Sequence, residues 1–442
     1  MIKRILYTLL IMFPVLASAQ INTDRVMAIG RNALYFEDYV LSIQYFNQVI
    51  NAKPYLSDPY FYRGLAKINL DDFQGAESDC SEAIERNPFV VSAYQVRGLA
   101  RIQQNNFAGA IEDYTKALEF DPENIGVWHN MALCRIRQED YKGAKNDLDK
   151  LIAISPRYTK AYLMRGEVDL KQKDTLAAEK DFGKAIEIDR YDADTWASRA
   201  ILRLQQQRYK DAEADFDHAI RLSTRNSGVY INRALARYHQ NNLRGAMSDY
   251  DIALDIDPNN FIGHYNRGLL RAQVGDDNRA IQDFNFVIEM EPDNMMAIFN
   301  RGLLLDQTGD YKGAIKDYST VINEYPNFLL GYQYRAQARR KIGDVKGADA
   351  DEFKVLKAQL DKQNGVDPNK QTADNTENNK TRKKSDKNMN NYRKIVVADN
   401  EEGEEKYKSD YRGRVQDKNV NIVPQPMFVL TYYEKHDDVK RQ

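Results

Sequence analysis

The stretch RGLLLDQTGDYKGAIKDY, residues 301–318, joins an arginine and a glycine to an aspartate sixteen positions after the arginine. Related stretches return along the chain every 34 residues, and a proline marks most of the periods. These prolines are Pro54, Pro88, Pro122, Pro156, Pro258, Pro292 and Pro326, with Arg190 and Thr224 at the two interruptions. Self-similarity at a fixed period is the signature of a repeat protein, and 34 residues accommodate two short helices with their turns. The sequence therefore predicts a stack of helical hairpins.

Small residues recur where the two helices of a hairpin would touch. One column holds alanine from Ala76 to Ala348, and a second holds glycine or alanine from Gly64 to Ala336. Small side chains allow two packed helices to approach closely. Each repeat is therefore expected to be a tightly packed pair of helices.

The pattern within each copy is more specific. With Ser57 as position one, most copies have an aromatic residue at positions four and twenty-four, Gly or Ala at eight, Ala at twenty and Pro at thirty-two. In this pattern the chain resembles the tetratricopeptide repeat (TPR) family over about residues 23–360, with ten copies if a degenerate first one is included. The departures are His264 and Ile298 at position four, and Cys80, Leu148 and Glu352 at position twenty-four. The resemblance implies an all-α fold, a right-handed superhelical solenoid of about ten helical hairpins, followed by a largely disordered C-terminal tail.

Arginine at position seven and aspartate at position twenty-three recur together, and Met131 interrupts the arginine column. A catalytic site would need its charges once, whereas a structural contact is needed in every copy. We therefore predict an ion pair between the two helices of each hairpin, with Arg135 as the replacement partner of Asp147. The predicted pairs are Arg63–Asp79, Arg97–Asp113, Arg165–Asp181, Arg199–Asp215, Arg233–Asp249, Arg267–Asp283, Arg301–Asp317 and Arg335–Asp351.

The resemblance also implies that the first helix of each repeat lines a concave groove that binds extended peptides or partner helices. Hydrogen-bond donors recur at groove positions six and thirteen, with aromatic residues beside them, which suits a peptide backbone. The candidate partner-binding residues are Asn232, Asn266, Asn300, Tyr238, His239, Tyr265, Gln273, Phe299 and Gln307. The alternative is that polar residues are favoured near a helix C-terminus whatever binds there.

The first residues have the layout of a secretory signal peptide. Lys3 and Arg4 precede an apolar run that ends at Ala17-Ser18-Ala19, so residues 1–19 are expected to be removed. A membrane anchor is the competing interpretation, but the run is shorter than the ~20 residues that span a bilayer. The mature protein is expected to be exported, periplasmic in a Gram-negative cell, and without a transmembrane span.

The composition changes after the repeats. We expect the solenoid at residues 20–360, a flexible linker at 361–392 and a C-terminal tail at 393–442. Within the tail, residues 427–433 have strand propensity and are a candidate for a short extended docking segment. Three alternatives are open: the tail occupies the groove of its own chain, recruits a partner, or packs loosely on the last repeat.

Motifs for catalysis are missing from the sequence. The five histidines are scattered without metal-ligand spacing, and HExxH, GxSxG, CxxC, phosphate-binding and dinucleotide-binding motifs do not occur. Cys80 and Cys134 fall in different repeats and are expected to be free thiols. We therefore predict no catalytic residues, no metal, no cofactor and no enzymatic activity.

The net charge of −2 provides no overall attraction to nucleic acid. The leading hypothesis is an exported, non-catalytic scaffold that binds a partner protein or peptide in the concave groove, in a cell-envelope assembly. The alternatives are a glycan-uptake or surface-binding component and an enzyme with an unrecognised site.

Overall fold

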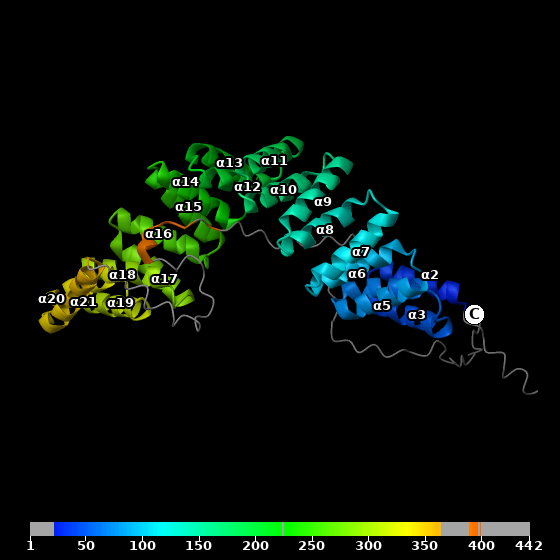
Figure 1. Ribbon diagram of the computed structural model, residues 1–442, viewed down its shortest axis with the longest axis horizontal. Coiled ribbons are helices and arrows are strands. Elements are labelled where there is room, and N and C mark those ends of the chain that lie inside the picture. Colours follow the sequence, from blue (N-terminus) through cyan, green and yellow to red (C-terminus); the bar gives the residue numbers. More distant parts are fainter. Residues whose placement is uncertain (1–21, 223–224, 364–388, 397, 399–442) are drawn as a thin grey trace, which may run out of the picture. The chain divides into compact units, whose positions relative to one another are not determined.

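The computed structural model describes residues 22–222, 225–363, 389–396 and 398. Over these residues the chain forms twenty α-helices and the 3-10 helix η2 (Met389–Asn391), shown in Figure 1. The predicted signal peptide, most of the predicted linker and the docking candidate at residues 427–433 lie outside the described residues.

The helices form ten successive antiparallel hairpins, which confirms the predicted all-α repeat fold. The pairs are α2 (Thr23–Tyr35) with α3 (Tyr39–Ala52), α4 (Asp58–Asn69) with α5 (Phe73–Arg86), α6 (Val91–Gln103) with α7 (Phe107–Phe120), α8 (Ile125–Arg137) with α9 (Tyr141–Ile154), α10 (Thr159–Lys171) with α11 (Thr175–Ile188), α12 (Ala193–Gln205) with α13 (Tyr209–Arg221), α14 (Ser227–His239) with α15 (Leu243–Ile256), α16 (Phe261–Gln273) with α17 (Asp277–Met290), α18 (Met295–Thr308) with α19 (Tyr311–Glu324), and α20 (Leu329–Lys341) with α21 (Val345–Gln363).

The described residues divide into two compact units. Unit 1 runs to Asp181 and unit 2 begins at Phe182, so the boundary falls within α11. Unit 2 also contains η2 and the residues that follow it to Ala398. The last helix of the repeats, α21, continues to Gln363, three residues beyond the predicted end of the solenoid.

The hairpin turns explain why each second helix begins where it does. In most hairpins an Asp or Asn caps the second helix; the Asp310 side chain, for example, accepts a hydrogen bond from the Gly313 backbone N–H at 3.0 Å. The residue directly before the cap has positive φ, and in the last three hairpins it is a glycine, such as Gly309 at 94°. Glycine adopts this left-handed conformation without the strain that a Cβ brings.

Each core is centred on the small-residue contact between the two helices of a hairpin. A Cβ built on Gly302 would lie 3.0 Å from Cε1 of Tyr318, and Ala314 beside it is fully buried. The larger buried side chains pack around these contacts and join one hairpin to the next.

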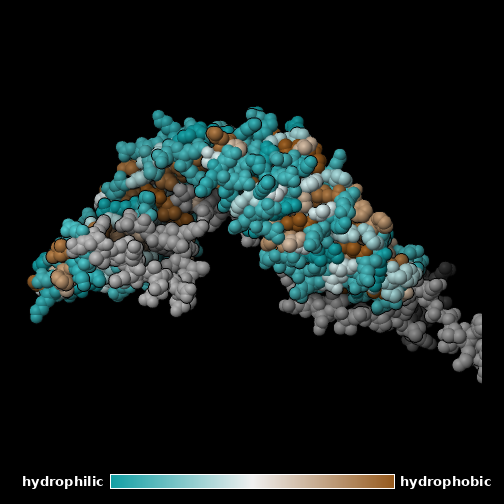
Figure 2. Space-filling view, viewed as in Figure 1, coloured by the Kyte–Doolittle hydropathy of each residue, from teal (hydrophilic) through white to brown (hydrophobic). Residues whose placement is uncertain are grey.

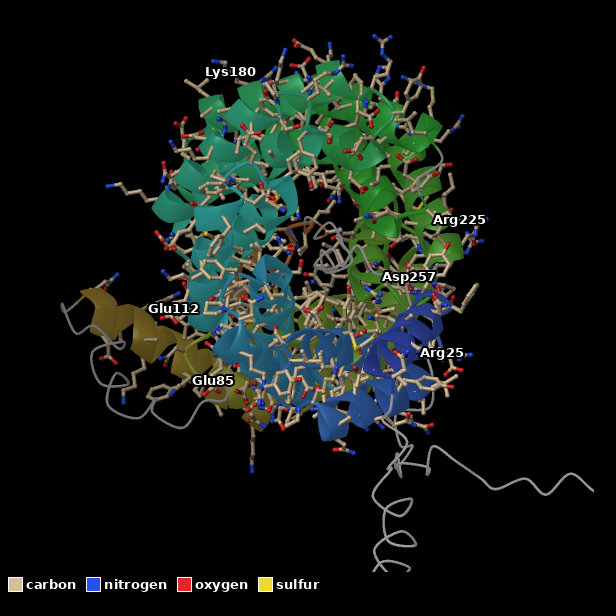
Figure 3. All side chains as sticks on the ribbon, turned by 90° about the vertical axis from the view of Figure 1, so that its right-hand side faces the viewer. Arg25, Glu85, Glu112, Lys180, Arg225 and Asp257 are labelled. Carbon is tan, nitrogen blue, oxygen red and sulfur yellow. The ribbon has the colours of Figure 1, made fainter. Side chains whose placement is uncertain are left out.

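Many charged side chains are exposed on the surface of the hairpins, apart from the buried aspartates of the repeat. Hydrophilic residues predominate on the face seen in Figure 2, and exposed side chains such as Glu112 and Lys180 project outward in Figure 3. None of the helices in the described part of the chain is long and apolar enough to cross a bilayer.

Candidate functional site

The predicted arginine–aspartate pairs are the most regular polar feature of the structure. Arg301 illustrates them: its Nη2 and Nε donate to the two carboxylate oxygens of Asp317 at 2.7 and 2.8 Å. The structure brings together all eight predicted pairs, with shortest N–O distances of 2.5 to 2.9 Å. The aspartates are at most 5% exposed, so these contacts link the two helices of a hairpin at a buried position.

A second cation shares most of these aspartates. It stands at position eleven, one helical turn after the first arginine, as in Arg271, whose Nη1 lies 2.8 Å from Asp283. The other members of this column on the same aspartates are Lys67, Arg101, Arg135, Arg203, Arg237 and Arg339. Where Met131 interrupts the first column, Arg135 is the cation that contacts Asp147, at 2.7 Å. From the sequence, only Arg135 of this column was predicted to contact an aspartate, although the basic residues at position eleven recur with the same 34-residue period.

The position-seven arginine also reaches the preceding repeat. The Nη1 atom of Arg267 donates to Asp251 at 2.8 Å, and that of Arg301 to Asn285 at 2.9 Å. The other contacts of this kind are Arg63 to Asn47, Arg97 to Ser81, Arg165 to Asp149, Arg233 to Asp217 and Arg335 to Ser319. The arginine therefore holds successive hairpins together as well as the two helices of its own hairpin.

The balance between burial and the surrounding cations sets the direction of the pKa shift of an aspartate, and burial raises the pKa of Asp113 although Arg97 and Arg101 both contact it. Burial alone would raise the pKa of Asp283, but hydrogen bonds from His264 and Arg267, with Arg271 nearby, hold that pKa below its ordinary value. Burial raises the pKa of Asp147 to about 6, because Arg135 lowers it only in part.

The predicted asparagines lie on the first helices of three consecutive hairpins of unit 2, and there they contact the segment of residues 389–398. We call this surface of α14, α16 and α18 the asparagine face. Figure 1 shows η2, at the start of the segment, in orange beside α16 and α18. Two asparagines hold one segment residue each by both backbone groups. Asn232 donates to the Ala398 carbonyl and accepts from its N–H, both at 2.9 Å. Asn266 does the same with Val396, at 2.7 and 2.8 Å.

The third asparagine and two of the predicted aromatic residues hold the start of the segment. The Tyr392 carbonyl accepts hydrogen bonds from Asn300 Nδ2 at 2.6 Å and from the Tyr265 hydroxyl at 2.7 Å. The Tyr392 ring meets the Phe299 ring edge-on, with centroids 4.8 Å apart. Met389 and Tyr392 are buried in the same apolar cluster as Phe299.

The remaining predicted residues surround these contacts. Tyr238, Gln273 and Gln307 line a cavity of about 350 Å³ between the helices and the segment, together with Arg393 and Ile395. His239 instead stacks on Tyr209, with ring centroids 4.5 Å apart, and burial lowers the pKa of its imidazole.

The polar groups of the asparagine face are neutral donors and acceptors. No group of three or more His, Cys, Asp or Glu side chains in the described part of the chain is arranged to hold a metal ion. Cys80 and Cys134 are buried free thiols, and burial raises the pKa of both, to about 12 for Cys134. At neutral pH these thiols remain protonated, so they are poor nucleophiles.

Sequence reasoning left open that the tail occupies the groove of its own chain, but it did not identify residues 389–398 as the occupant. Residues 389–392 were assigned to the linker, whereas here they pack on α18, and the docking candidate was placed at 427–433. The available signal was the apolar group Ile395, Val396 and Val397 after a polar stretch.

Among solved structures, the chain is similar to a tetratricopeptide repeat protein from Parabacteroides merdae, with 21% identity, 56% of this chain and 98% of that chain covered, and a TM-score of 0.44. It is also similar to the C-terminal part of a TPR repeat-containing protein from Cytophaga hutchinsonii, with 18% identity, 54% and 97% coverage and a TM-score of 0.46. A third is YrrB, described as a TPR protein with an unusual peptide-binding site, with 18% identity, 42% and 95% coverage and a TM-score of 0.38.

No curated protein sequence matches the chain significantly. Models described as TPR repeat and tetratricopeptide repeat match residues 98–134, 125–158, 159–192, 198–261 and 265–327. These matches cover about half of the chain and include the three hairpins of the asparagine face, while the hairpins of the Arg63–Asp79 and Arg335–Asp351 pairs lie outside them. The chain therefore belongs to the tetratricopeptide repeat family.

Proposed function

We propose that the protein is a non-catalytic scaffold whose asparagine face binds an extended peptide segment of a partner protein by its backbone. The observation that carries this proposal is the paired hydrogen bonding of Asn232 and Asn266. Each amide donates to the carbonyl and accepts from the N–H of a single segment residue.

This contact favours one backbone conformation over others. A side-chain amide has a donor and an acceptor side by side, and it can meet the N–H and C=O of one residue when these point the same way, as they do in an extended chain. The two residues held in this way, Val396 and Ala398, are two positions apart, so their side chains share one face of an extended segment. These hydrogen bonds involve only backbone groups of the segment, so a segment of different sequence can form them as well.

Side-chain preference is then expected from the apolar surroundings. The Tyr392 ring occupies an aromatic site formed by Phe299 and its neighbours. The adjacent cavity, with Gln273 and Gln307 at its wall, leaves room beside Ile395 for a larger side chain. We expect a partner segment to present an aromatic residue four positions before the first residue that is held by both backbone groups.

The segment of residues 389–398 is the resident ligand of this face in our proposal. Because it belongs to the same chain, its binding is intramolecular and its effective concentration does not depend on the protein concentration. A partner must outcompete it, so the resident segment limits binding to partners of higher affinity.

The setting of this function is proposed from the N-terminal sequence. The basic start, apolar run and Ala17-Ser18-Ala19 ending support export, and we propose a role in a cell-envelope assembly. The two alternatives, a glycan-uptake or surface-binding component and an enzyme, have no contact in the described part of the chain that favours them.

The test uses the full chain with its own segment displaced. Val396→Pro removes the N–H that Asn266 accepts from, and Val396→Thr is the matched control that keeps it. A labelled peptide of sequence MNNYRKIVVA is expected to bind the Val396→Pro chain more tightly than the control chain, as measured by fluorescence anisotropy. Adding Asn266→Ala to Val396→Pro should weaken that binding at least tenfold. Equal binding with and without Asn266 would refute the proposal. Crosslinking in the native envelope followed by mass spectrometry would then identify the partner.

A further inference from the structure

One arginine of the position-seven column differs from all the others at its Nη1 atom. In seven hairpins this atom donates to a side chain of the preceding repeat, and in three of them that acceptor is the carboxylate of Asp149, Asp217 or Asp251 at 2.6 to 2.8 Å. At Arg199 the equivalent position is Gly183, which has no side chain to accept. Arg199 still donates from Nε and Nη2 to Asp215, both at 2.9 Å, and no acceptor for its Nη1 is present among the described residues.

Open space occupies the place of the missing side chain. A Cβ built on Gly183 would meet only Arg199 Nη1, at 3.9 Å. Gly183 and Arg199 line a surface pocket of about 630 Å³ on unit 2, together with Arg190 and Arg221. These two arginines are exposed and have no ion-pair partner among the described residues.

The other groups of the pocket give it an aromatic wall and a positive charge. The Trp196 indole stacks on His218 with centroids 4.2 Å apart, and its Nε1 donates to the Arg190 carbonyl at 3.0 Å. Glu187 is the one carboxylate that lines the pocket, and it contacts Lys184 at 2.9 Å. The charges of Arg190 and Arg221 are therefore not compensated at the pocket itself.

We propose that this pocket binds the phosphate group of a small phosphate monoester, with one oxygen at the position that an aspartate carboxylate occupies in the neighbouring repeats. The three aspartate contacts show that an anion fits against this arginine nitrogen. Arginine presents its donors in a geometry that matches phosphate oxygens, and the two additional arginines favour a doubly charged ligand over a carboxylate. An aromatic substituent on the phosphate would find Trp196 and Tyr191 at the wall.

The decisive variant is Gly183→Asp, which supplies from within the chain the carboxylate that the other repeats have. Its backbone is helical and its Cβ has room, so the variant is expected to fold with unchanged or raised thermal stability. The matched control is Asn285→Asp, because it adds the same charge at the same repeat position, where Arg301 already has an acceptor. Both variants are made in the full chain.

Binding of inorganic phosphate and of phenyl phosphate is measured by calorimetry at constant ionic strength, with chloride as the reference anion. We expect saturable binding to the wild type and to Asn285→Asp, and at least a tenfold loss in Gly183→Asp. Tighter binding of phenyl phosphate than of inorganic phosphate would support a monoester whose substituent contacts the aromatic wall, and tighter binding of inorganic phosphate would overturn the assignment of a monoester. The proposal is overturned if the wild type shows no saturable binding, or if Gly183→Asp binds as tightly as the wild type.

Discussion

The hairpins α8–α9 and α16–α17 have an aspartate and an asparagine at the same repeat positions, but these side chains have different hydrogen-bond and ion-pair partners. In α16–α17, Asp283 receives hydrogen bonds from Arg267, Arg271 and His264, and Asn266 holds both backbone groups of Val396. In α8–α9, Met131 takes the place of the first arginine, Asp147 has one basic partner, and the Oδ1 of the buried Asn130 has no hydrogen-bond partner among the described residues.

The difference shows that a repeated residue acquires its role from its partner. Asp283, with His264, Arg267 and Arg271 around it, has a pKa below its ordinary value, whereas burial raises the pKa of Asp147 to about 6 because Arg135 compensates that burial only in part. An asparagine that meets a backbone segment becomes a binding residue, whereas the same residue at Asn130 remains a buried polar group.

The largest effect is expected from Asp283→Ala. The substitution leaves two arginines that are about 15% exposed without their shared carboxylate, and breaking such a buried contact costs about 3–5 kcal/mol. Hydrogen exchange of the α16–α17 amides should therefore accelerate by at least a hundredfold. Asp251→Ala is the control: this carboxylate is about half exposed, and we expect a loss of under about 1 kcal/mol. Similar losses in both variants would contradict the structural role of the buried aspartate.

Asn266→Ala is expected to release the segment. Two hydrogen bonds of about 1 kcal/mol each are lost, so exchange at the Val396 amide should accelerate about thirtyfold while the helices keep their protection. Asn130→Ala removes the same residue type from the same repeat position in unit 1 and should leave the Val396 amide unchanged. An equal response to both substitutions would mean that general destabilisation, and not the backbone contact, controls the segment.

Asp147→Asn tests the sign of the charge effect. Since the pKa of Asp147 is raised to about 6 from an ordinary value of 3.8, its stabilising contribution is complete below pH 3.8 and is lost as the pH rises through about 6. The neutral asparagine avoids this loss, so at pH 7 the variant should be about 1–2 kcal/mol more stable than the wild type, after the weaker contact with Arg135 is discounted. The advantage should disappear at pH 4 in urea unfolding of the α8–α9 region.

The opposite sign is expected at the comparison hairpin. The lowered pKa of Asp283 makes its contribution present above pH 3.8 and lost as the pH falls through the folded-state pKa. Asp283→Asn should therefore destabilise at pH 7. If both asparagine variants shifted stability in the same direction at pH 7, the assignment of opposite pKa shifts to Asp147 and Asp283 would fail.

The smallest effect is expected from Asn130→Leu. Replacement of a buried polar group that has an unpaired oxygen by an apolar group of similar shape is close to neutral, and we expect a change within about 1 kcal/mol. Asn266→Leu, by contrast, should displace the segment as Asn266→Ala does. A large loss of stability in Asn130→Leu would indicate that this amide has a structural contact comparable to that of Asn266.

Much of the fold could be predicted from the sequence because every repeat has the same local pattern of helix-packing residues. The period of 34 residues and the small-residue columns are local, and the helical hairpins follow the period that they predict. The two helices that contribute an arginine–aspartate pair, such as Arg301 and Asp317, are adjacent in the chain, so their pairing could be inferred from spacing alone. The contacts from position seven to the preceding repeat escaped prediction because their acceptors vary between Asn, Ser and Asp.

The asparagine column could be identified from the sequence, but its occupant could not. The segment contacts Asn232 and Asn266 across 166 and 130 residues, and these contacts are made by backbone atoms. Backbone recognition leaves no pattern in the side chains of the recognised residues, which is why the more apolar group at 427–433 was a stronger candidate by sequence than residues 389–398.

The sequence by itself determined the repeat, the hairpins and the positions of the polar columns, because these depend on helical spacing and on neighbours within about one repeat. Only the tertiary structure decided which columns have partners: the segment of residues 389–398 on the asparagine face, the single cation at Asp147, and the empty acceptor position at Gly183. The physical reason is that the groups within hydrogen-bond distance determine whether a buried polar group is stabilised. Neighbours that are distant in the sequence cannot be inferred from the repeat period.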